Sequence, residues 1–366
     1  MKRILTIITA LFFGAALTVQ INAETDDFRT EIMGQLSDAD ISDIQSELES
    51  FGISSGEPES VGNLSISKIF GYIAGIAKES LTRPLRIVLI VSVFAAICQL
   101  STTLSYKAGL YGELFVLICF IAISPLVVDT FKGSIASMQS CNAFMVSYVP
   151  AFAAIAAASG NIAAAASYNA VVLYFCEAAA IITTTVLKPI LCCMFVLAAT
   201  QALNPDLMNL TSTLRNALTT VIGFIMTLFL GVIGLQTIVG RGAETLAVKA
   251  GKYAVSSFVP VIGYSLSESY KAVSLSLSAI RSAVGAFGIV VMCLFMLSPI
   301  VSAVIYKATF QLCCWICRLT GADRLAAMMN GLSDVFSFLC TVLLMFMLML
   351  TVATGMLILL GGELLA

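Results

Sequence analysis

Residues 251–263, GKYAVSSFVPVIG, interrupt a long series of apolar segments with a Ser-Phe-Val-Pro break. An earlier stretch, residues 147–150, reads SYVP, and its proline lies 110 residues before the later one. Proline removes a backbone donor, so both stretches predict breaks in helices. Paired broken helices are typical of translocation or channel scaffolds. The candidate channel or packing residues at these breaks are therefore Pro150, Phe258, Pro260 and Gly263.

Composition indicates a polytopic membrane protein. Of the 366 residues, 59% are hydrophobic and 11% are charged, and the mean hydropathy is +1.01. Soluble domains carry about 25% charged residues. The chain contains no histidine, the side chain most often used as a base, proton shuttle or metal ligand. We therefore predict an all-α membrane fold and no enzymatic activity.

The N-terminal part of the chain divides into three regions. Residues 1–23 show the charge, apolar core and small residue of a secretory signal peptide, with an uncleaved signal anchor as the alternative. Residues 24–60 hold eleven acids and one base, and form an acidic extracytoplasmic region with a short amphipathic helix. Residues 61–86 carry four basic residues among apolar ones, which predicts a basic interfacial helix.

Residues 87–366 form the predicted multi-pass membrane domain. A bilayer crossing needs about 20 apolar residues, and five runs approach or exceed that length: 87–105, 109–128, 170–187, 217–239 and 336–360. Breaks at Lys188-Pro189 and Ser298-Pro299 add further helices, giving about eight transmembrane helices. The segments at Pro150 and Pro260 are then two possible re-entrant segments, because that topology keeps most basic residues in the cytoplasm.

The membrane domain also shows a possible internal repeat. Three residue pairs share the offset of 110: Pro150 with Pro260, Pro189 with Pro299, and Gln201 with Gln311. This register predicts repeat units at residues 108–210 and 218–320, related by inversion in the membrane. Shared membrane composition is the alternative explanation.

Two acidic residues lie within apolar runs. Glu177 and Glu113 are candidate channel residues, because an ionisable group inside a membrane helix is costly and marks a functional site by default. Glu177 lies deeper in its predicted helix, whereas Glu113 is close to a helix end. Ion or proton handling by Glu177 and an interhelical hydrogen bond from its protonated carboxyl are both open.

The eleven cysteines include a CxxC motif at Cys314 and Cys317. Most of the others are scattered through apolar segments, where cysteine behaves as a small hydrophobic residue. A zinc site gathers four ligands, and no phosphate-binding glycine loop or Ser-His-Asp set occurs in the sequence. We predict no metal site, no cofactor and no catalytic residues.

An ordered set of motifs resembles a known family. The motifs are GLQT at 234–237, KYAVSSFVPVIGYSLSES at 252–269, SAVGAFG at 282–288 and GADRLAAMMNGLSDV at 321–335. They follow a signal segment, an acidic region and a basic interfacial stretch. In this order they resemble the stage III sporulation protein AE family of endospore-forming bacteria, from about residue 36 to the end of the chain.

The resemblance implies a non-enzymatic component of a channel complex that links mother cell and forespore and is needed for late forespore gene expression. It implies the outer forespore membrane, derived from the mother cell, as the location. It also implies partners: other proteins of the stage III sporulation A operon and the forespore stage II sporulation protein Q. No nucleic acid is expected as a partner, and no catalytic residues carry over. A stand-alone secondary transporter for a small solute or ion is the alternative.

Overall fold

The computed structural model describes residues 66–104, 108–158, 162–203, 210–258 and 263–359. Within these residues every regular element is a helix, so the predicted all-α fold is confirmed. The predicted signal peptide (1–23), the acidic region (24–60) and Pro260 lie outside the described residues.

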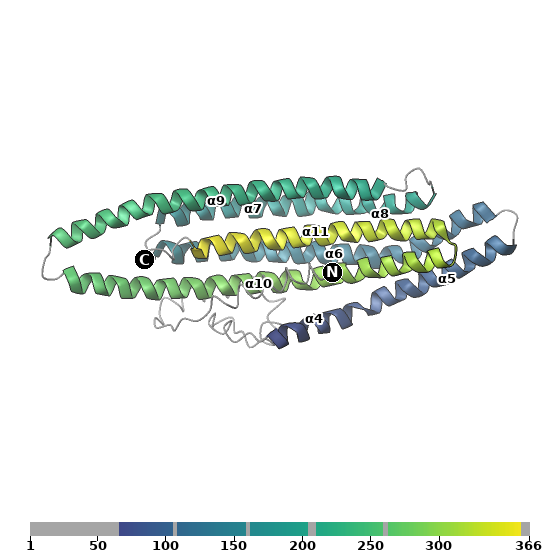
Figure 1. Ribbon diagram of the computed structural model, residues 1–366, viewed down its shortest axis with the longest axis horizontal. Helices are drawn as coiled ribbons and strands as arrows, with labels where there is room; N and C mark the ends of the chain where they lie inside the picture. The colour runs from purple at the N-terminus through teal and green to yellow at the C-terminus, as the bar shows by residue number, and fades with distance from the viewer. Residues whose placement is uncertain (1–65, 105–107, 159–161, 204–209, 259–262, 360–366) are drawn as a thin grey trace.

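The helices form an elongated antiparallel bundle (Figure 1). They are α4 (Ile66–Ser80), α5 (Thr82–Leu104), α6 (Ala108–Ala158), α7 (Ile162–Ile181), the π-helical turn η3 (Ile182–Leu187), α8 (Lys188–Leu203), α9 (Leu210–Phe258), α10 (Gly263–Leu319) and α11 (Asp323–Leu359). The helix ends that join α5 to α6, α8 to α9 and α10 to α11 lie at one end of the bundle, on the right in Figure 1. Those that join α6 to α7 and α9 to α10 lie toward the other end.

Six segments of the described chain are long and apolar enough to cross a membrane. They are Thr82–Leu100, Glu113–Ile155, Ala165–Leu203, Leu210–Leu235, Ser282–Leu319 and Asp323–Met356. The predicted count of about eight is not confirmed, because helices continue where breaks were predicted. α6 runs through Pro150 and α10 runs through Pro299, so no re-entrant turn exists at Pro150. Membrane helices tolerate proline because neighbouring helices and local adjustments satisfy the freed backbone groups.

The Lys188-Pro189 pair does not end its helix either. In a regular α-helix the Pro189 ring would clash with the carbonyl of Thr185, four residues earlier. The π-helical turn η3, which contains Thr185, lies directly before this pair. A π turn is wider than an α turn and gives the ring room. The chain therefore continues from α7 into α8 as one long path.

The α10–α11 hairpin is the centre of the bundle. In the most apolar 18-residue stretch of each span, 72% of the residues in α10 and 61% in α11 are buried, compared with 17–28% in the other four spans. α4, α5 and α6 pack on α10, whereas α8 and α9 pack on α11. The hairpin thus supplies the surface on which α4, α5, α6, α8 and α9 assemble, whereas α7 packs mainly on α6 and α9.

The turn between α10 and α11 depends on one glycine. Gly321 has φ +74°, the left-handed conformation that side chains disfavour. The N–H of Ala322 donates to the carbonyl of Cys317 at 2.8 Å, and the N–H of Gly321 donates to that of Arg318 at 3.1 Å. These two bonds form a Schellman motif, so the start of the GADR motif ends α10 and allows α11 to turn back at once.

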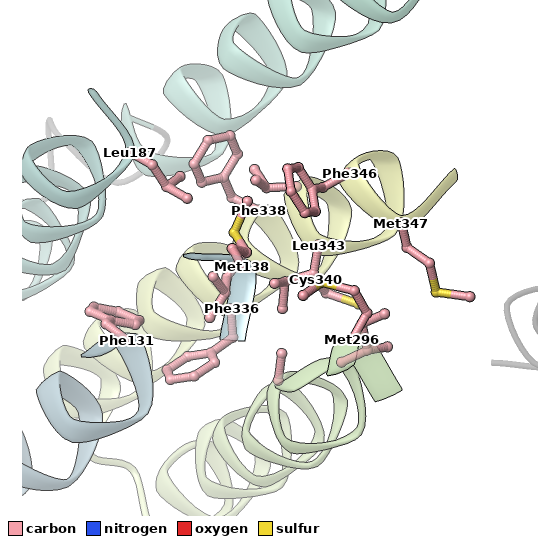
Figure 2. Packing of buried hydrophobic residues seen from close by; sticks show 14 of the residues in the cluster. Phe131, Met138, Leu187, Met296, Phe336, Phe338, Cys340, Leu343, Phe346 and Met347 are labelled. Atoms are coloured by element: carbon pink, nitrogen blue, oxygen red, sulfur yellow. The ribbon is translucent and has the colours of Figure 1, made fainter. Parts of the chain in front are cut away.

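Aromatic rings fill the space where α6, α10 and α11 meet. Phe336 of α11 stacks on Tyr306 of α10 with ring centroids 5.0 Å apart. The same ring lies 5.4 Å from Phe131 of α6 and 5.4 Å from Phe310 of α10. Figure 2 shows Phe336 and Phe131 among the buried side chains of this cluster. Such aromatic clusters contribute much of the packing energy of a core.

Two glycines of the SAVGAFG motif allow α6 and α11 to approach α10 closely. A Cβ at Gly288 would lie 2.3 Å from the ring of Tyr148, and one at Gly285 would lie 2.4 Å from Ile358. The Tyr148 hydroxyl donates to the carbonyl of Val284 at 3.0 Å. The SYVP stretch, predicted to be a re-entrant segment, therefore forms a packing contact between two continuous helices.

Candidate functional site

Charged side chains gather in one layer of the bundle. Arg215 of α9 forms an ion pair with Asp334 of α11, with 2.5 Å between Nη1 and Oδ1. Lys307 of α10 donates from Nζ to Ser337 Oγ of α11 at 3.1 Å. Charges inside apolar helices are costly unless they are paired. These contacts therefore satisfy charged groups on three helices at one level.

On the other side of α10 the same layer borders a cavity of about 660 Å³. Pockets of 300–1,000 Å³ are typical of small-molecule sites. It is open on one side, and its walls come from α4 and α5, from α6, and from α10. Its lining is rich in hydroxyl groups: Ser80, Thr130, Ser134, Ser137, Ser298, Ser302, Tyr72 and Tyr306.

The cavity also holds one cationic and one anionic side chain, Arg83 of α5 and Asp129 of α6. Both act electrostatically on Tyr306. The Tyr306 residue is only 3% exposed, and its hydroxyl faces Thr130 without a hydrogen bond of normal geometry. A buried polar group in this state calls for a partner such as water or a ligand. The cavity thus offers a cation, an anion and several hydroxyl groups to a small polar solute or to water.

The structure does not bring the two predicted acidic residues together. Glu113, near the start of α6, pairs with Arg324 in the first turn of α11, with 2.6 Å between Oε1 and Nη1. Both side chains of that pair are more than 40% exposed. Glu177 lies on the exposed face of α7, fifteen residues after the helix begins at Ile162. No hydrogen bond or ion pair joins it to another described residue.

Of the predicted break residues, Ser298 and Pro299 line the cavity, whereas Pro150, Phe258 and Gly263 do not. Pro150 is exposed near the end of α6, Phe258 is the last residue of α9, and Gly263 is the first residue of α10. Pro260 lies outside the described residues. A role of these residues in a channel stays a prediction.

Sequence reasoning missed the cavity. Its α6 wall carries Asp129, Thr130, Gly133, Ser134 and Ser137, small or polar residues on one helical face within an apolar span. A polar face at helical spacing inside a membrane helix indicates contact with other polar groups or with water. That periodicity was one available signal, and the Ser298-Pro299 pair, which was predicted as a helix break and lines the cavity, was another.

The eleven cysteines are free thiols. Cys314 and Cys317 of the CxxC motif are buried on α10. In the part of the chain that the structure describes, no three cysteine, aspartate or glutamate residues are arranged to hold a metal ion. The prediction that the chain has no metal site stays a prediction.

Comparison with known proteins identifies the family. The family model described as stage III sporulation protein AE matches residues 46–359. The stage III sporulation protein AE of Bacillus subtilis (strain 168) is 20% identical over 274 residues, which cover 72% of this chain and 68% of the relative. No solved structure matches. Because the family model covers most of the sequence, the resemblance seen in the motifs is confirmed: the chain belongs to the stage III sporulation protein AE family and is a sporulation-related membrane protein.

Proposed function

We propose that this protein is a non-enzymatic membrane component of a channel complex that links mother cell and forespore. Family membership carries the proposal, since the match from residue 46 to residue 359 includes every described helix. The protein is proposed to be required for late gene expression in the forespore. The proposed location is the outer forespore membrane, which derives from the mother cell.

The proposed partners are the other proteins of the stage III sporulation A operon and the forespore stage II sporulation protein Q. Six long antiparallel helices support a role as a membrane scaffold, because long packed helices hold their ends at defined positions in and beyond the bilayer. The hydroxyl-rich cavity supports a role in contact with water or a polar solute.

The proposal is tested by depleting the protein in its own host during sporulation. Reporters for early and late forespore transcription are measured in the same cells. We expect the late reporter to fall to background while the early reporter and engulfment stay normal, and a plasmid copy to restore the late signal. Normal late transcription without the protein would contradict the proposal.

The cavity also favours one other function, a stand-alone transporter of a small polar solute. A site that offers one cationic side chain, one anionic side chain and several hydroxyl groups suits such a substrate. The purified chain in proteoliposomes distinguishes the two. A channel component that needs its partners gives no solute uptake, whereas a transporter gives uptake that Arg83→Ala and Asp129→Asn abolish.

A further inference from the structure

Two opposite charges line the cavity without pairing with each other. Arg83 of α5 and Asp129 of α6 are both exposed and both line it. No ion pair or hydrogen bond joins either one to another described residue, although the bundle pairs charges between helices elsewhere, as Arg215 with Asp334 shows. Both charges are therefore open to a third group, and a group that carries both signs would satisfy them together.

The α6 wall of the cavity presents acceptor atoms. The Thr130 hydroxyl donates to the carbonyl of Leu126 at 3.0 Å, and the Ser134 hydroxyl donates to the carbonyl of Thr130 at 2.9 Å. Each hydroxyl uses its proton within the helix, so its oxygen can only accept a further hydrogen bond. Together with the Asp129 carboxylate, these oxygens suit an ammonium group, which has donors and no acceptor.

The α5 and α10 walls present donors. The guanidinium of Arg83 has several N–H donors and no acceptor, in a planar arrangement that matches a carboxylate or a phosphate. Tyr306 of α10 is 3% exposed, and its hydroxyl has no hydrogen-bond partner among the described residues. A buried hydroxyl without a partner is costly. An anionic oxygen in the cavity would accept from this hydroxyl and from Arg83.

Small residues leave the cavity open. Gly75 of α4 and Gly133 of α6 line it, and no neighbouring atom lies within 4 Å of the position that a Cβ would take at either residue. At Gly285 and Gly288 of α10, by contrast, a Cβ would collide with neighbouring side chains. Helix packing therefore requires the glycines of α10 and does not require those of the cavity. What Gly75 and Gly133 provide is volume for something other than protein.

We infer that the cavity binds a small zwitterionic group, with its ammonium at Asp129 and its anionic end at Arg83. A free amino acid carries this pair of charges, and so does the head group of phosphatidylethanolamine. A volume of about 660 Å³ holds either one with several waters, since a water takes about 30 Å³ in the liquid. The open side admits a solute or lets lipid chains remain outside. The inference rests on the contact with a polar solute proposed above, and not on the channel complex.

The test measures the melting temperature of the purified full-length chain in a detergent free of phospholipid. L-alanine and O-phosphoethanolamine carry both charges, and propionate and ethylamine are controls with one charge each; all are titrated from micromolar to millimolar concentration. A probe at about ten times its Kd should raise the melting temperature by about 2–4 °C. We expect this rise with at least one zwitterion and with neither control, because a single charge leaves Arg83 or Asp129 unpaired.

A lipid measurement separates the two sources of the zwitterion. The chain is placed in nanodiscs that contain equal amounts of phosphatidylethanolamine and phosphatidylglycerol, and native mass spectrometry identifies the lipid that stays bound after release. Preferential retention of phosphatidylethanolamine identifies a lipid head group. Stabilisation by L-alanine without such retention identifies a free solute. Either result supports the inference.

Substitutions in the cavity locate the site. Arg83→Gln and Asp129→Asn should each weaken binding of the zwitterion at least about tenfold, because one charge of the ligand loses its partner. Arg86→Gln and Lys132→Gln are matched controls. They lie three residues further along the same helices, are exposed and do not line the cavity, so binding should be unchanged.

A third variant blocks the volume and leaves the charges in place. Gly133→Leu adds a side chain one helical turn from Asp129, where no neighbouring atom obstructs it, so the chain should keep its fold and lose binding. Gly231→Leu on α9 also meets open space but lies outside the cavity, and it should keep both.

Three results would overturn the inference: no binding of either zwitterion or of phosphatidylethanolamine, an equal response to propionate or ethylamine, or unchanged binding in the Arg83, Asp129 and Gly133 variants. The channel proposal is judged separately, through late forespore transcription. A chain that binds no zwitterion and is still required for that transcription would remove this inference alone.

Discussion

The α10–α11 hairpin and the outer helix α9 are similar in composition and opposite in environment. The mean hydropathy of their spans is 2.5 and 2.6 for the hairpin and 2.3 for α9. Yet 72% and 61% of the residues in the most apolar stretches of the hairpin are buried, against 17% in α9. Hydropathy therefore indicates that a helix can cross a membrane, but it does not indicate whether the helix faces lipid or protein.

Small residues show the difference that hydropathy hides. A side chain at Gly285 or Gly288 of α10, or at Gly331 of α11, would collide with neighbouring atoms. Gly223 and Gly231 of α9 have no neighbouring atom within 4 Å of the position a Cβ would take. Close approach of helices in membranes depends on small residues at the contact, so the position of a glycine matters more than its presence.

The largest expected effect is on an aromatic ring of the hairpin. Phe336→Ala removes a ring that is 0% exposed and contacts three other rings. We expect a loss of about 3–5 kcal/mol in the free energy of unfolding. The matched change Phe224→Ala, on the exposed face of α9, should cost less than about 1 kcal/mol. Reversible unfolding in detergent, followed by circular dichroism, measures both, and equal losses would contradict the division into core and outer helices.

The next largest loss of stability is expected when a side chain is added where two helices are in close contact. Gly288→Leu would force the Tyr148 ring away and break its hydrogen bond to Val284. Overpacking of this kind costs about 1–3 kcal/mol. Gly231→Leu, where the structure leaves open space, should be neutral or slightly stabilising, because leucine favours helix more than glycine does. A lower melting temperature for Gly288→Leu alone is the expected outcome, and a similar fall in both variants would remove the support for this contact.

The smallest expected losses in the free energy of unfolding come from breaking two ion pairs that differ in exposure. Asp334→Ala leaves the charge of Arg215 without its partner in a half-buried position, at a cost of about 1–3 kcal/mol. Glu113→Ala breaks a pair whose side chains are more than 40% exposed, and the expected cost is about 0–1 kcal/mol. A double-mutant cycle of Asp334→Ala with Arg215→Ala measures the coupling. If the coupling energy of Asp334 with Arg215 is no larger than that of Glu113 with Arg324, the half-buried ion pair does not stabilise the fold more than the exposed one does.

Several features were predictable from local sequence. Composition and apolar runs gave the all-α membrane class, and Glu113 was placed close to a helix end, where the structure pairs it with Arg324. The breaks at Pro150 and Ser298-Pro299 were wrong as predictions of turns. Proline removes one backbone N–H donor, but a long helix that packs against neighbouring helices continues through the proline despite that loss.

The cavity and the exposed position of Glu177 could not be predicted in the same way. Arg83, Asp129 and Tyr306 lie on three different helices and meet only because α5 and α6 both pack on α10. Tyr148 and Gly288 are 140 residues apart, and nothing near either one indicates their contact. The sequence did identify Glu177 as unusual, whereas its place on the exposed face of α7 follows from the packing of its neighbours.

The amino-acid sequence by itself determined that this chain is helical, enters a membrane and carries the ordered motifs of its family. Composition and local spacing suffice for these properties, because a bilayer requires every backbone group to be paired within a helix. Only the tertiary structure decided which apolar helices form the core and which polar groups share a cavity. The physical reason is that lipid and protein interior are both apolar, so a membrane helix lacks the polar face that marks the outside of a soluble helix.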